Sequence, residues 1–333
     1  MIALSTAYNI NKHKSPESLV DEILSLGFAA IELNVEVPAD FIPEIAKRIK
    51  VVSVHNFCPK LDTIPEGRTI YSPYSISSTS EHERIKAIRL TERTIDVADN
   101  VGAKAVIIHV GEVEMERTGR ALAKKYIDTT RPEAGGGNES KAGYDYYLEK
   151  FLAERKQKSD IYIDNVLKTL DKLTTYAERK NIKIGVENRF WADEIPSFED
   201  YDVIFKKFSG GPIGIWYDTG HAMVAEKQGL IKSHLDFLKK YYFNLIGVHL
   251  HDVVDVYDHK APGTGEVDFS GISKYMSVET ILVNETHSSA TAEDLKNSTE
   301  YLKNNGFRKF IDSKIKRSQH RREKCLNYDE TRL

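Results

Sequence analysis

Histidine, aspartate and glutamate residues recur at the ends of short apolar segments in this sequence. The segment IGVHLHDV, residues 246–253, carries His249 and His251 two positions apart. In an extended strand, residues two apart lie on the same face, so both imidazoles would point the same way while the apolar residues between them face the opposite side. Imidazoles need hydrogen-bond partners and contribute little to an apolar core. The pair therefore indicates either a binding site or a strand end that is open to water.

Similar polar residues end five further apolar segments: His55, His109, Glu187, Asp218 and Glu285, with His221 just beyond Asp218. If these segments are parallel strands of one barrel, their carboxyl ends meet at one face. Glu187, Asp218, His249 and Glu285 would then form a ring of three carboxylates and one imidazole. Converging carboxylates repel one another and raise one another's pKa values unless a cation lies among them. Mn²⁺, Mg²⁺, Co²⁺ or Zn²⁺ would suit these oxygen and nitrogen ligands, whereas the alternative is that each acid pairs separately with a lysine or arginine.

The sequence alternates between strand-like and helix-like segments. Eight short segments rich in β-branched residues are bounded by polar residues or glycine: 2–8, 29–34, 51–57, 105–111, 183–188, 213–220, 245–252 and 280–286. Helical patterns separate them, and the first begins at Ser15 and Pro16, an N-cap followed by proline, and ends at Gly27. This alternation predicts an α/β fold, a (β/α)8 TIM barrel. A two-domain doubly wound fold fits less well, because we find neither a linker nor a glycine-rich dinucleotide fingerprint.

Two segments lie outside the repeating units of the barrel domain, which spans residues 1–306. Residues 112–145 form a long polar insertion after the fourth strand, and we expect them to be a mobile loop over the barrel mouth. Residues 307–333 form a C-terminal tail extension that is locally basic. A solvated helix and a contact with an anionic partner are the two interpretations of this tail.

The composition is that of a soluble globular protein. Hydrophobic residues make up 41% of the 333 residues and charged residues 29%, which allows a large core. The formal net charge of −3 gives no general attraction to nucleic acid. With only Cys58 and Cys325, a disulfide framework is not expected and a reducing cytoplasm fits. Since no signal-peptide pattern or membrane-spanning apolar run is present, we expect a cytoplasmic protein without a membrane partner.

Four motifs carry a resemblance to a known family: VENRFW (186–191), WYDTGHAMV (216–224), VHLHD followed by HKAPGTGEVDF (248–252 and 259–269), and VNETH (283–287). In this order they resemble the successive motifs of the xylose-isomerase-like TIM-barrel superfamily. That superfamily includes sugar phosphate isomerases and epimerases, the ketose 3-epimerases, inosose dehydratase and, as a more distant relative, endonuclease IV. The resemblance covers about residues 1–306, while the insertion and the tail are not typical of it.

The resemblance to the ketose 3-epimerases implies a metal site and a pair of acid–base residues. Glu187, Asp218, His249 and Glu285 would bind one divalent metal ion. Glu187 and Glu285 would also transfer protons on opposite faces of the substrate, and His221 would hold a substrate oxygen. Removing a proton beside a carbonyl needs a carboxylate within hydrogen-bond reach and a cation that stabilises the developing enediolate.

The resemblance to endonuclease IV implies more metal ions. In that enzyme the residues matching His55 and His109 bind a further zinc ion, and those matching His221 and His259 bind a third. This sequence departs from the pattern because Tyr257 stands where a third-site aspartate is expected.

The neighbouring acids, Asp255 and Asp258, are out of register with that expected aspartate. We therefore assign His55 and His109 to substrate contacts or to supporting the metal ligands, and a second metal ion at this pair is the alternative. His251, His259 and Arg189 complete the predicted substrate-binding residues: His55, His109, Arg189, His221, His251 and His259. Arg189 is equally suited to a salt bridge at the barrel rim.

The leading functional prediction is an enzyme of carbohydrate metabolism. It would be a divalent-metal-dependent isomerase or epimerase of a small sugar, polyol or sugar phosphate, working by proton transfer between two carboxylates through an enediolate. The alternatives are an inosose-type dehydratase, which also begins by removing a proton beside a carbonyl, an endonuclease IV-like phosphodiesterase acting on abasic DNA, and a barrel that only binds its ligand. The expected partner is a small-molecule carbohydrate, and assembly into a homo-oligomer is left open.

Overall fold

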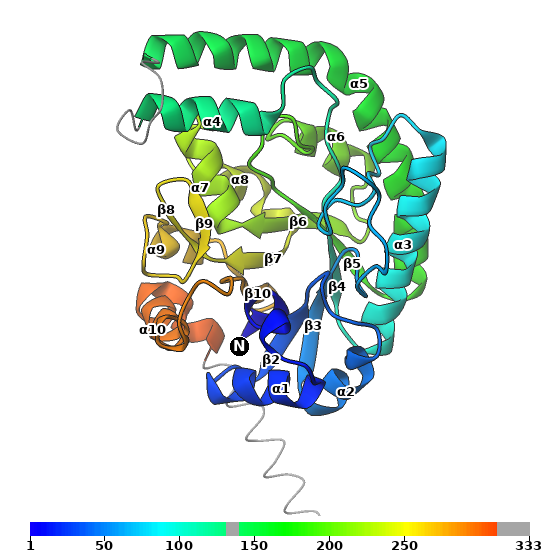
Figure 1. The fold of residues 1–333 in the computed structure, drawn as a ribbon, viewed down its shortest axis with the longest axis vertical. Coiled ribbons are helices and arrows are strands. Elements are labelled where there is room, and N and C mark those ends of the chain that lie inside the picture. The colour runs from blue at the N-terminus through cyan, green and yellow to red at the C-terminus, as the bar shows by residue number, and fades with distance from the viewer. Residues whose placement is uncertain (131–139, 312–333) are drawn as a thin grey trace, which may run out of the picture.

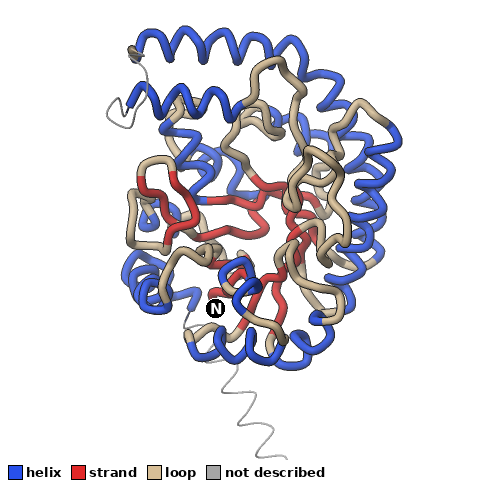
Figure 2. The backbone as a smooth tube through the Cα atoms, in the orientation of Figure 1, coloured by secondary structure: helices blue, strands red, loops and turns tan. Residues whose placement is uncertain are grey.

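Eight parallel strands close into a barrel in the computed structural model, which describes residues 1–130 and 140–311 (Figures 1 and 2). The strands are β1 (Ile2–Ser5), β2 (Ala30–Leu33), β3 (Lys50–His55), β4 (Ala105–Ile108), β5 (Lys183–Glu187), β6 (Ile213–Asp218), β7 (Leu245–Leu250) and β10 (Ile281–Asn284). Their order around the barrel is β1-β10-β7-β6-β5-β4-β3-β2, and β1 pairs with both β10 and β2. The predicted (β/α)8 barrel is therefore confirmed.

Helices surround the barrel (Figure 1). They are α1 (Pro16–Ser25), α2 (Phe41–Arg48), α3 (Glu81–Asn100), α4 (Gly119–Thr130), α5 (Lys141–Arg179), α6 (Asp200–Lys207), α7 (Thr219–Lys227), α8 (Asp236–Tyr241), α9 (Phe269–Ser273) and α10 (Ala292–Leu302). The predicted start of α1 is confirmed, because Ser15 caps it by accepting a hydrogen bond from the Ser18 N–H and Pro16 is its first residue. Apolar residues of the helices and the strands share one core, as Leu19 and Ile23 of α1 do with Ile31 of β2.

A small antiparallel hairpin follows β7 and lies outside the barrel sheet. Its strands are β8 (Asp252–Val254) and β9 (Tyr257–Lys260). The turn between them contains Asp255 in a left-handed backbone conformation with φ of 61°, and His259 of β9 has φ of 56°. These two residues interrupt the regular alternation of side chains along the hairpin.

The insertion after β4 is largely helical, so the prediction of a loop is wrong for most of its described part. Residues 119–130 form α4, and residues 141–145 are the beginning of the long helix α5. Figure 1 shows α4 and the first half of α5 running side by side and projecting from the barrel. Leu122 of α4 is buried in one cluster with Tyr144 and Phe151 of α5. This apolar contact explains why an insertion that is polar overall forms helices.

Two parts of the sequence lie outside the described residues, namely 131–139 of the insertion and 312–333 of the basic tail. Both interpretations of the tail therefore remain predictions. Within the described ranges, none of the helices combines the length and the apolar character needed to cross a membrane.

The indole of Trp216 fills the barrel interior and depends on two glycines beside it. Trp216 is fully buried, and its ring lies 5.3 Å, centroid to centroid, from the imidazole of His249. A Cβ atom added to Gly247, its register partner on β7, would lie 2.3 Å from the indole, and one added to Gly185 would lie 2.8 Å from it. The two glycines thus leave the space that the indole occupies beneath the polar barrel mouth.

Gly247→Ala should lower the free energy of unfolding by about 1–3 kcal/mol, because the added methyl group overlaps the indole of Trp216 in a close-packed interior. Chemical denaturation of the variant and the wild-type protein measures this difference. In a Trp216→Leu background the same substitution should cost less, since the overlapping ring is gone. An equal cost in both backgrounds would contradict the proposed overlap.

Candidate functional site

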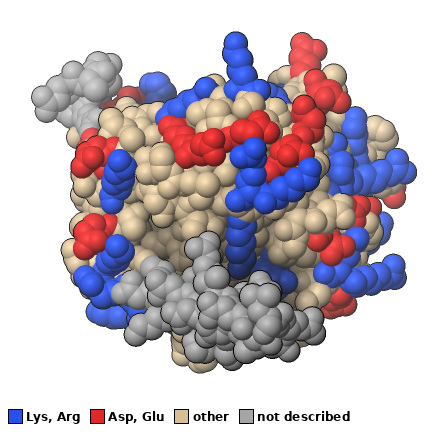
Figure 3. All heavy atoms as spheres, turned by 90° about the horizontal axis from the view of Figure 1, so that it is seen from below, with Lys and Arg blue, Asp and Glu red and all other residues tan. Residues whose placement is uncertain are grey.

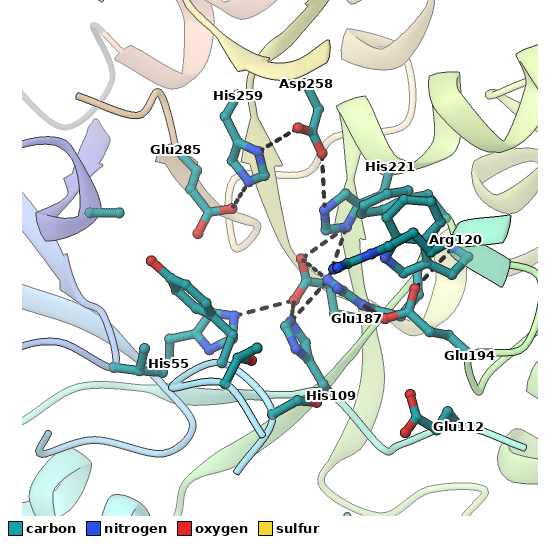
Figure 4. A pocket seen from close by; sticks show the side chains of 18 of the residues that line it. His55, His109, Glu112, Arg120, Glu187, Glu194, His221, Asp258, His259 and Glu285 are labelled. Carbon is teal, nitrogen blue, oxygen red and sulfur yellow. Dashed lines mark hydrogen bonds and ion pairs between the residues drawn. The ribbon is translucent and has the colours of Figure 1, made fainter. Parts of the chain in front are cut away.

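The predicted polar residues do meet at the carboxyl ends of the barrel strands. His55, Glu187 and Asp218 end β3, β5 and β6, His249 lies near the end of β7, and His109 and Glu285 directly follow β4 and β10. Figure 4 shows His55, His109, Glu187, His221, His259 and Glu285 pointing toward one another from these elements. The barrel closure brings together residues that are far apart in the sequence.

A central group consists of Glu187, Asp218, His249 and Glu285, all buried, with one ligand-type atom of each within 4.8 Å of the others. Nδ1 of His249 lies 2.9 Å from Glu285 Oε2, 3.3 Å from Glu187 Oε1 and 3.6 Å from Asp218 Oδ2. One imidazole nitrogen therefore faces three carboxylate oxygens. This donor set of three oxygens and one nitrogen suits a divalent metal ion.

A second group uses the other oxygen of Glu187. Nε2 of His109 lies 2.7 Å from Glu187 Oε2, and Nε2 of His55 lies 3.3 Å from the same atom. Nδ1 of His55 is 3.1 Å from the backbone carbonyl of Asn56, which can only accept, so this nitrogen carries a proton. Nε2 of His55 can then interact favourably with the Glu187 carboxylate in two ways. Either it carries a second proton and donates it in a hydrogen bond, or both atoms bind a cation. Both uses predicted for His55 and His109, substrate contact and metal binding, fit this arrangement.

A third group contains a carboxylate that the sequence analysis set aside. Asp258 Oδ1 lies 2.9 Å from His259 Nδ1, and Asp258 Oδ2 lies 3.7 Å from His221 Nε2. His259 Nε2 is in turn 3.9 Å from Glu285 Oε2, so the third group adjoins the central one. Although Asp258 stands one position away from the aspartate of the endonuclease IV motif, its carboxylate reaches both histidines.

The local backbone explains why Asp258 was missed. In a regular strand, Asp258 and His259 would point to opposite faces. Because His259 has φ of 56°, that alternation fails and both side chains reach the same site. Only the presence of an acidic residue next to a candidate histidine could have indicated this in the sequence.

His251 has different contacts from those expected of a substrate-binding residue. Its Nε2 lies within 2.9 Å of both carboxylate oxygens of Asp218, and its Nδ1 accepts a hydrogen bond of 2.9 Å from the backbone N–H of His259. Although ring nitrogens of His221, His251 and His259 lie within 4.8 Å of one another, both nitrogens of His251 are already engaged. The side chain is fully buried behind Asp218 and holds that carboxylate in place.

Arg189 forms the rim salt bridge and also extends into the site. Its Nε donates a hydrogen bond of 2.9 Å to Glu194, forming the salt bridge at the rim. Its Nη1 lies 3.1 Å from His109 Nε2 and 3.4 Å from His221 Nδ1, so the guanidinium also reaches the site. Arg189 can therefore offer a fixed positive charge to an oxygen atom in the pocket.

A pocket of about 620 Å³ gives access to these groups. Seven of the predicted residues line it: His55, His109, Glu187, Arg189, His221, His259 and Glu285. Asp218, His249 and His251 are fully buried and do not line it. The insertion contributes Glu112, Thr118 and Arg120 to the wall. The volume lies in the range of small-molecule sites.

Electrostatic contacts keep the two central glutamates ionised despite their burial. Burial raises the pKa of Glu187, but the neighbouring His109 and hydrogen bonds from histidines hold this pKa well below its usual range. Burial also raises the pKa of Glu285, but the neighbouring His249 and His259 have the larger effect and lower this pKa below its usual value. Burial, together with Arg189, lowers the pKa of His109 to about 4. At neutral pH the carboxylates are thus anionic, as metal binding requires. Burial lowers the pKa of His249, but Glu285 and Glu32 raise it well above its usual range, so a cation at Nδ1 would replace a proton there.

Asp252 anchors the loop that carries Asp258 and His259. The carboxylate is fully buried, and its Oδ1 accepts hydrogen bonds from the N–H groups of Val253 and Val267 at 2.9 and 3.0 Å. Its Oδ2 accepts from the N–H groups of Gly263 and Gly265, both at 2.9 Å. Four backbone N–H groups, those of residues 253, 263, 265 and 267, therefore converge on one side chain. The sequence analysis did not single out this residue.

Comparison with known proteins identifies similar sequences and folds. A model of the family described as xylose isomerase-like TIM barrel matches residues 20–305. The fold is similar to that of a D-tagatose 3-epimerase-like protein, with a TM-score of 0.60 and 17% identity, covering 94% of this chain and 99% of that one. It is also similar to the IOLI protein with a bound zinc atom, with a TM-score of 0.57 and 14% identity, covering 92% and 98%. At these identities the structural likeness concerns the fold.

A curated sequence relative is the uncharacterised protein y4fM of Sinorhizobium fredii, which is 22% identical over 198 residues. The matched region is 59% of this chain and 50% of that protein, so the chain spans about half the length of the curated relative that it matches.

Asp252→Asn should lower the free energy of unfolding by about 2–4 kcal/mol, because the amide nitrogen that replaces one oxygen cannot accept and leaves two buried N–H groups unpaired. Hydrogen exchange of the amides in residues 253–267 should become faster, as measured by mass spectrometry. Glu266→Gln is the matched control in the same loop, since its ion pair with Lys227 is largely exposed on the Glu266 side and should contribute at most about 1 kcal/mol. Equal effects of both substitutions would contradict the anchoring role of Asp252.

Proposed function

The chain belongs to the xylose isomerase-like TIM-barrel family, and we propose that it is a divalent-metal-dependent isomerase or epimerase of a small sugar, polyol or sugar phosphate. The convergence of Glu187, Asp218 and Glu285 on one nitrogen of His249 is the observation that carries this proposal. The similar fold of a D-tagatose 3-epimerase-like protein supports it, and family membership agrees with the prediction of an enzyme.

The central group fits a divalent cation. Glu187 Oε1, Asp218 Oδ2, His249 Nδ1 and Glu285 Oε2 would hold it, since their mutual repulsion is relieved only by positive charge. A cation bound there would polarise a substrate carbonyl and neutralise the charge that develops when a proton is removed beside it. The oxygen-rich donor set leaves Mn²⁺, Co²⁺, Mg²⁺ and Zn²⁺ as the candidates.

Two carboxylates can perform the proton transfer. Glu187 and Glu285 come from different sides of the barrel, β5 and the end of β10, and both line the pocket. One of them would remove the proton from the carbon next to the carbonyl, giving an enediolate. The other, after taking up a proton from water or from a substrate hydroxyl, would return a proton to the neighbouring carbon or to the opposite face. Which of the two acts first depends on how the substrate lies.

Neighbouring residues would bind the substrate oxygens. His221 Nδ1 lies 3.0 Å from the backbone carbonyl of Asn188 and donates to it, so Nε2 can accept a hydrogen bond from a substrate hydroxyl. Arg189 would donate to a carbonyl, hydroxyl or phosphate oxygen. The pocket wall formed by Arg120 and Thr118 of the insertion would select among sugars and their phosphates.

The adjoining metal-type groups favour a second candidate function. Because the second group shares Glu187 and the third adjoins Glu285, the site could hold up to three cations, as an endonuclease IV-like phosphodiesterase on abasic DNA would require. Against this, the pocket wall carries the acids Glu112, Asp193 and Glu194 beside the arginines Arg68, Arg120 and Arg189, so it offers no excess of positive charge to DNA phosphates. Figure 3 shows acidic and basic side chains interspersed over the visible face as well.

An inosose-type dehydratase is a third candidate, since its first step is the same proton removal. A cytoplasmic location, a carbohydrate partner and a homo-oligomeric assembly are proposals of the same kind.

Adding Mn²⁺, Co²⁺ or Zn²⁺ to metal-stripped protein should raise its thermal unfolding temperature, because a ligand present at 100 times its Kd stabilises the folded state by about 2.7 kcal/mol. Elemental analysis should find one tightly bound ion per chain, which Asp218→Asn and Glu285→Gln should each release. Glu112→Gln, in the same pocket wall but outside the central group, is the control that should retain the ion. Three tightly bound ions per chain would favour the phosphodiesterase, and no binding at all would refute the metal site.

Incubation in D₂O with Mn²⁺ and a panel of ketoses, inososes and their phosphates should place deuterium on the carbon beside the carbonyl of the true substrate, as seen by NMR. Glu187→Gln and Glu285→Gln should each slow this exchange by at least about 100-fold, the usual contribution of a general acid or base. The metal content of both variants must be measured, since both residues are also proposed ligands. Absence of exchange on every compound, together with nicking of abasic duplex DNA, would replace the isomerase proposal.

A further inference from the structure

We infer that Glu32 is a positioning residue that fixes which nitrogen of His249 faces the metal site. The inference rests on the metal site of the proposed function. Glu32 lies one residue before the carboxyl end of β2 and is fully buried. Its Oε1 is 3.0 Å from His249 Nε2, and its Oε2 accepts a hydrogen bond of 2.7 Å from the hydroxyl of Ser53.

The closure of the barrel brings Glu32 and His249 together. Glu32 and Ser53 are register neighbours on β2 and β3, so the hydroxyl lies directly beside the carboxylate. His249 comes from β7, which is not adjacent to β2 in the barrel order, and its side chain reaches Glu32 across the interior. Within residues 1–130 and 140–311, no lysine or arginine forms an ion pair with Glu32. The imidazole is thus the charged or chargeable group that accompanies this buried carboxylate.

Hydrogen-bond chemistry then assigns the two imidazole nitrogens. A carboxylate accepts but does not donate, so Nε2 of His249 must carry the proton that it shares with Glu32. Nδ1 can therefore keep a lone pair, and it is Nδ1 that lies 2.9–3.6 Å from the three carboxylates of the central group. A nitrogen lone pair among carboxylate oxygens is a ligand position for a cation.

The surroundings limit any other orientation of the ring. Trp216 lies against it edge-on at 5.3 Å, and the ring of His55 is stacked on it at 5.9 Å, both between centroids. The neighbouring interior cluster is apolar, and it includes Ala30, Ala105 and Val283. Burying a carboxylate in apolar surroundings costs free energy unless both of its oxygens are hydrogen-bonded, as those of Glu32 are.

The role of Glu32 is tested by metal affinity, measured as the Kd for Zn²⁺ and Mn²⁺ in competition with a chelator. Glu32→Ala should weaken binding by about 10- to 100-fold, the usual effect of removing a partner of a metal-bound histidine. Glu32→Gln should weaken it less, because its carbonyl oxygen can still accept from Nε2 while the negative charge is lost. Ser53→Ala leaves the contact between Glu32 and His249 intact, so this control should change the Kd least.

A second measurement reports on the tautomer, which a purely structural role would not set. In ¹⁵N-histidine-labelled, zinc-loaded protein, NMR should show the proton of His249 on Nε2, with the signal assigned by its loss in His249→Gln. In Glu32→Ala, this Nε2–H should exchange faster with solvent. A proton on Nδ1 in the wild-type protein would overturn the inference.

The affinities separate this inference from the proposed function. If Glu285→Gln loses the metal while Glu32→Ala keeps the wild-type Kd, the metal site stands and the role of Glu32 is refuted. If the wild-type protein binds no divalent metal, both are refuted. Denaturation curves of Glu32→Ala and Glu32→Gln show whether a lost affinity reflects unfolding, and the Gln variant, which has the same shape as Glu, decides the outcome if the Ala variant does not fold.

Discussion

The accumulation of negative charge at the carboxyl ends of the strands is the constraint on which the site depends. Glu187, Asp218 and Glu285 are buried within a few ångströms of one another, and Asp258 contacts His259, which adjoins Glu285. Two like charges 4 Å apart repel by about 4 kcal/mol at the effective dielectric constant of a protein. The arrangement is therefore tolerable only with positive charge among the carboxylates. The fixed charge of Arg189 and the surrounding imidazoles supply part of it, and the oxygen and nitrogen donors of the central group suit a cation.

Hydrogen bonds outside the site hold its donors in place. Asp218 is bound by His251 and by the backbone N–H of His221, at 2.7 Å in the latter case, while His249 is bound by Glu32. Asp252 gathers the loop that presents Asp258. Since a metal site requires donors at defined distances, such contacts reduce the reorganisation that binding would need. Hydrogen bonds thus link the buried polar groups beneath the barrel mouth into one network that holds the donor atoms in position.

The insertion after β4 forms part of the pocket wall. Its helices α4 and α5 pack on each other through apolar residues, so Thr118 and Arg120 approach the pocket from an ordered element. The barrel strands position the reactive groups, while the segments that follow them form the walls. A change in the insertion can therefore alter the shape and charge of the pocket wall without disturbing Glu187 or Glu285.

The sequence by itself determined the barrel and the central group. Alternation with period two, together with polar residues at the ends of parallel strands, was enough to place Glu187 and Glu285 at one face, because both signals are local. The helical form of the insertion was not visible, since it depends on contacts between segments on either side of residues 131–139.

Only the tertiary structure decided which other polar residues join the site. Asp258 reaches the site because His259, next to it in the hairpin, has a left-handed backbone conformation that breaks the alternation of side chains. His251 lies behind Asp218 rather than in the pocket, since the loop after β7 folds back onto it. Glu32 meets His249 across 217 residues of sequence. Periodicity indicates which face a residue occupies, whereas contacts between distant residues depend on barrel closure and on the paths of the loops, which no local pattern encodes.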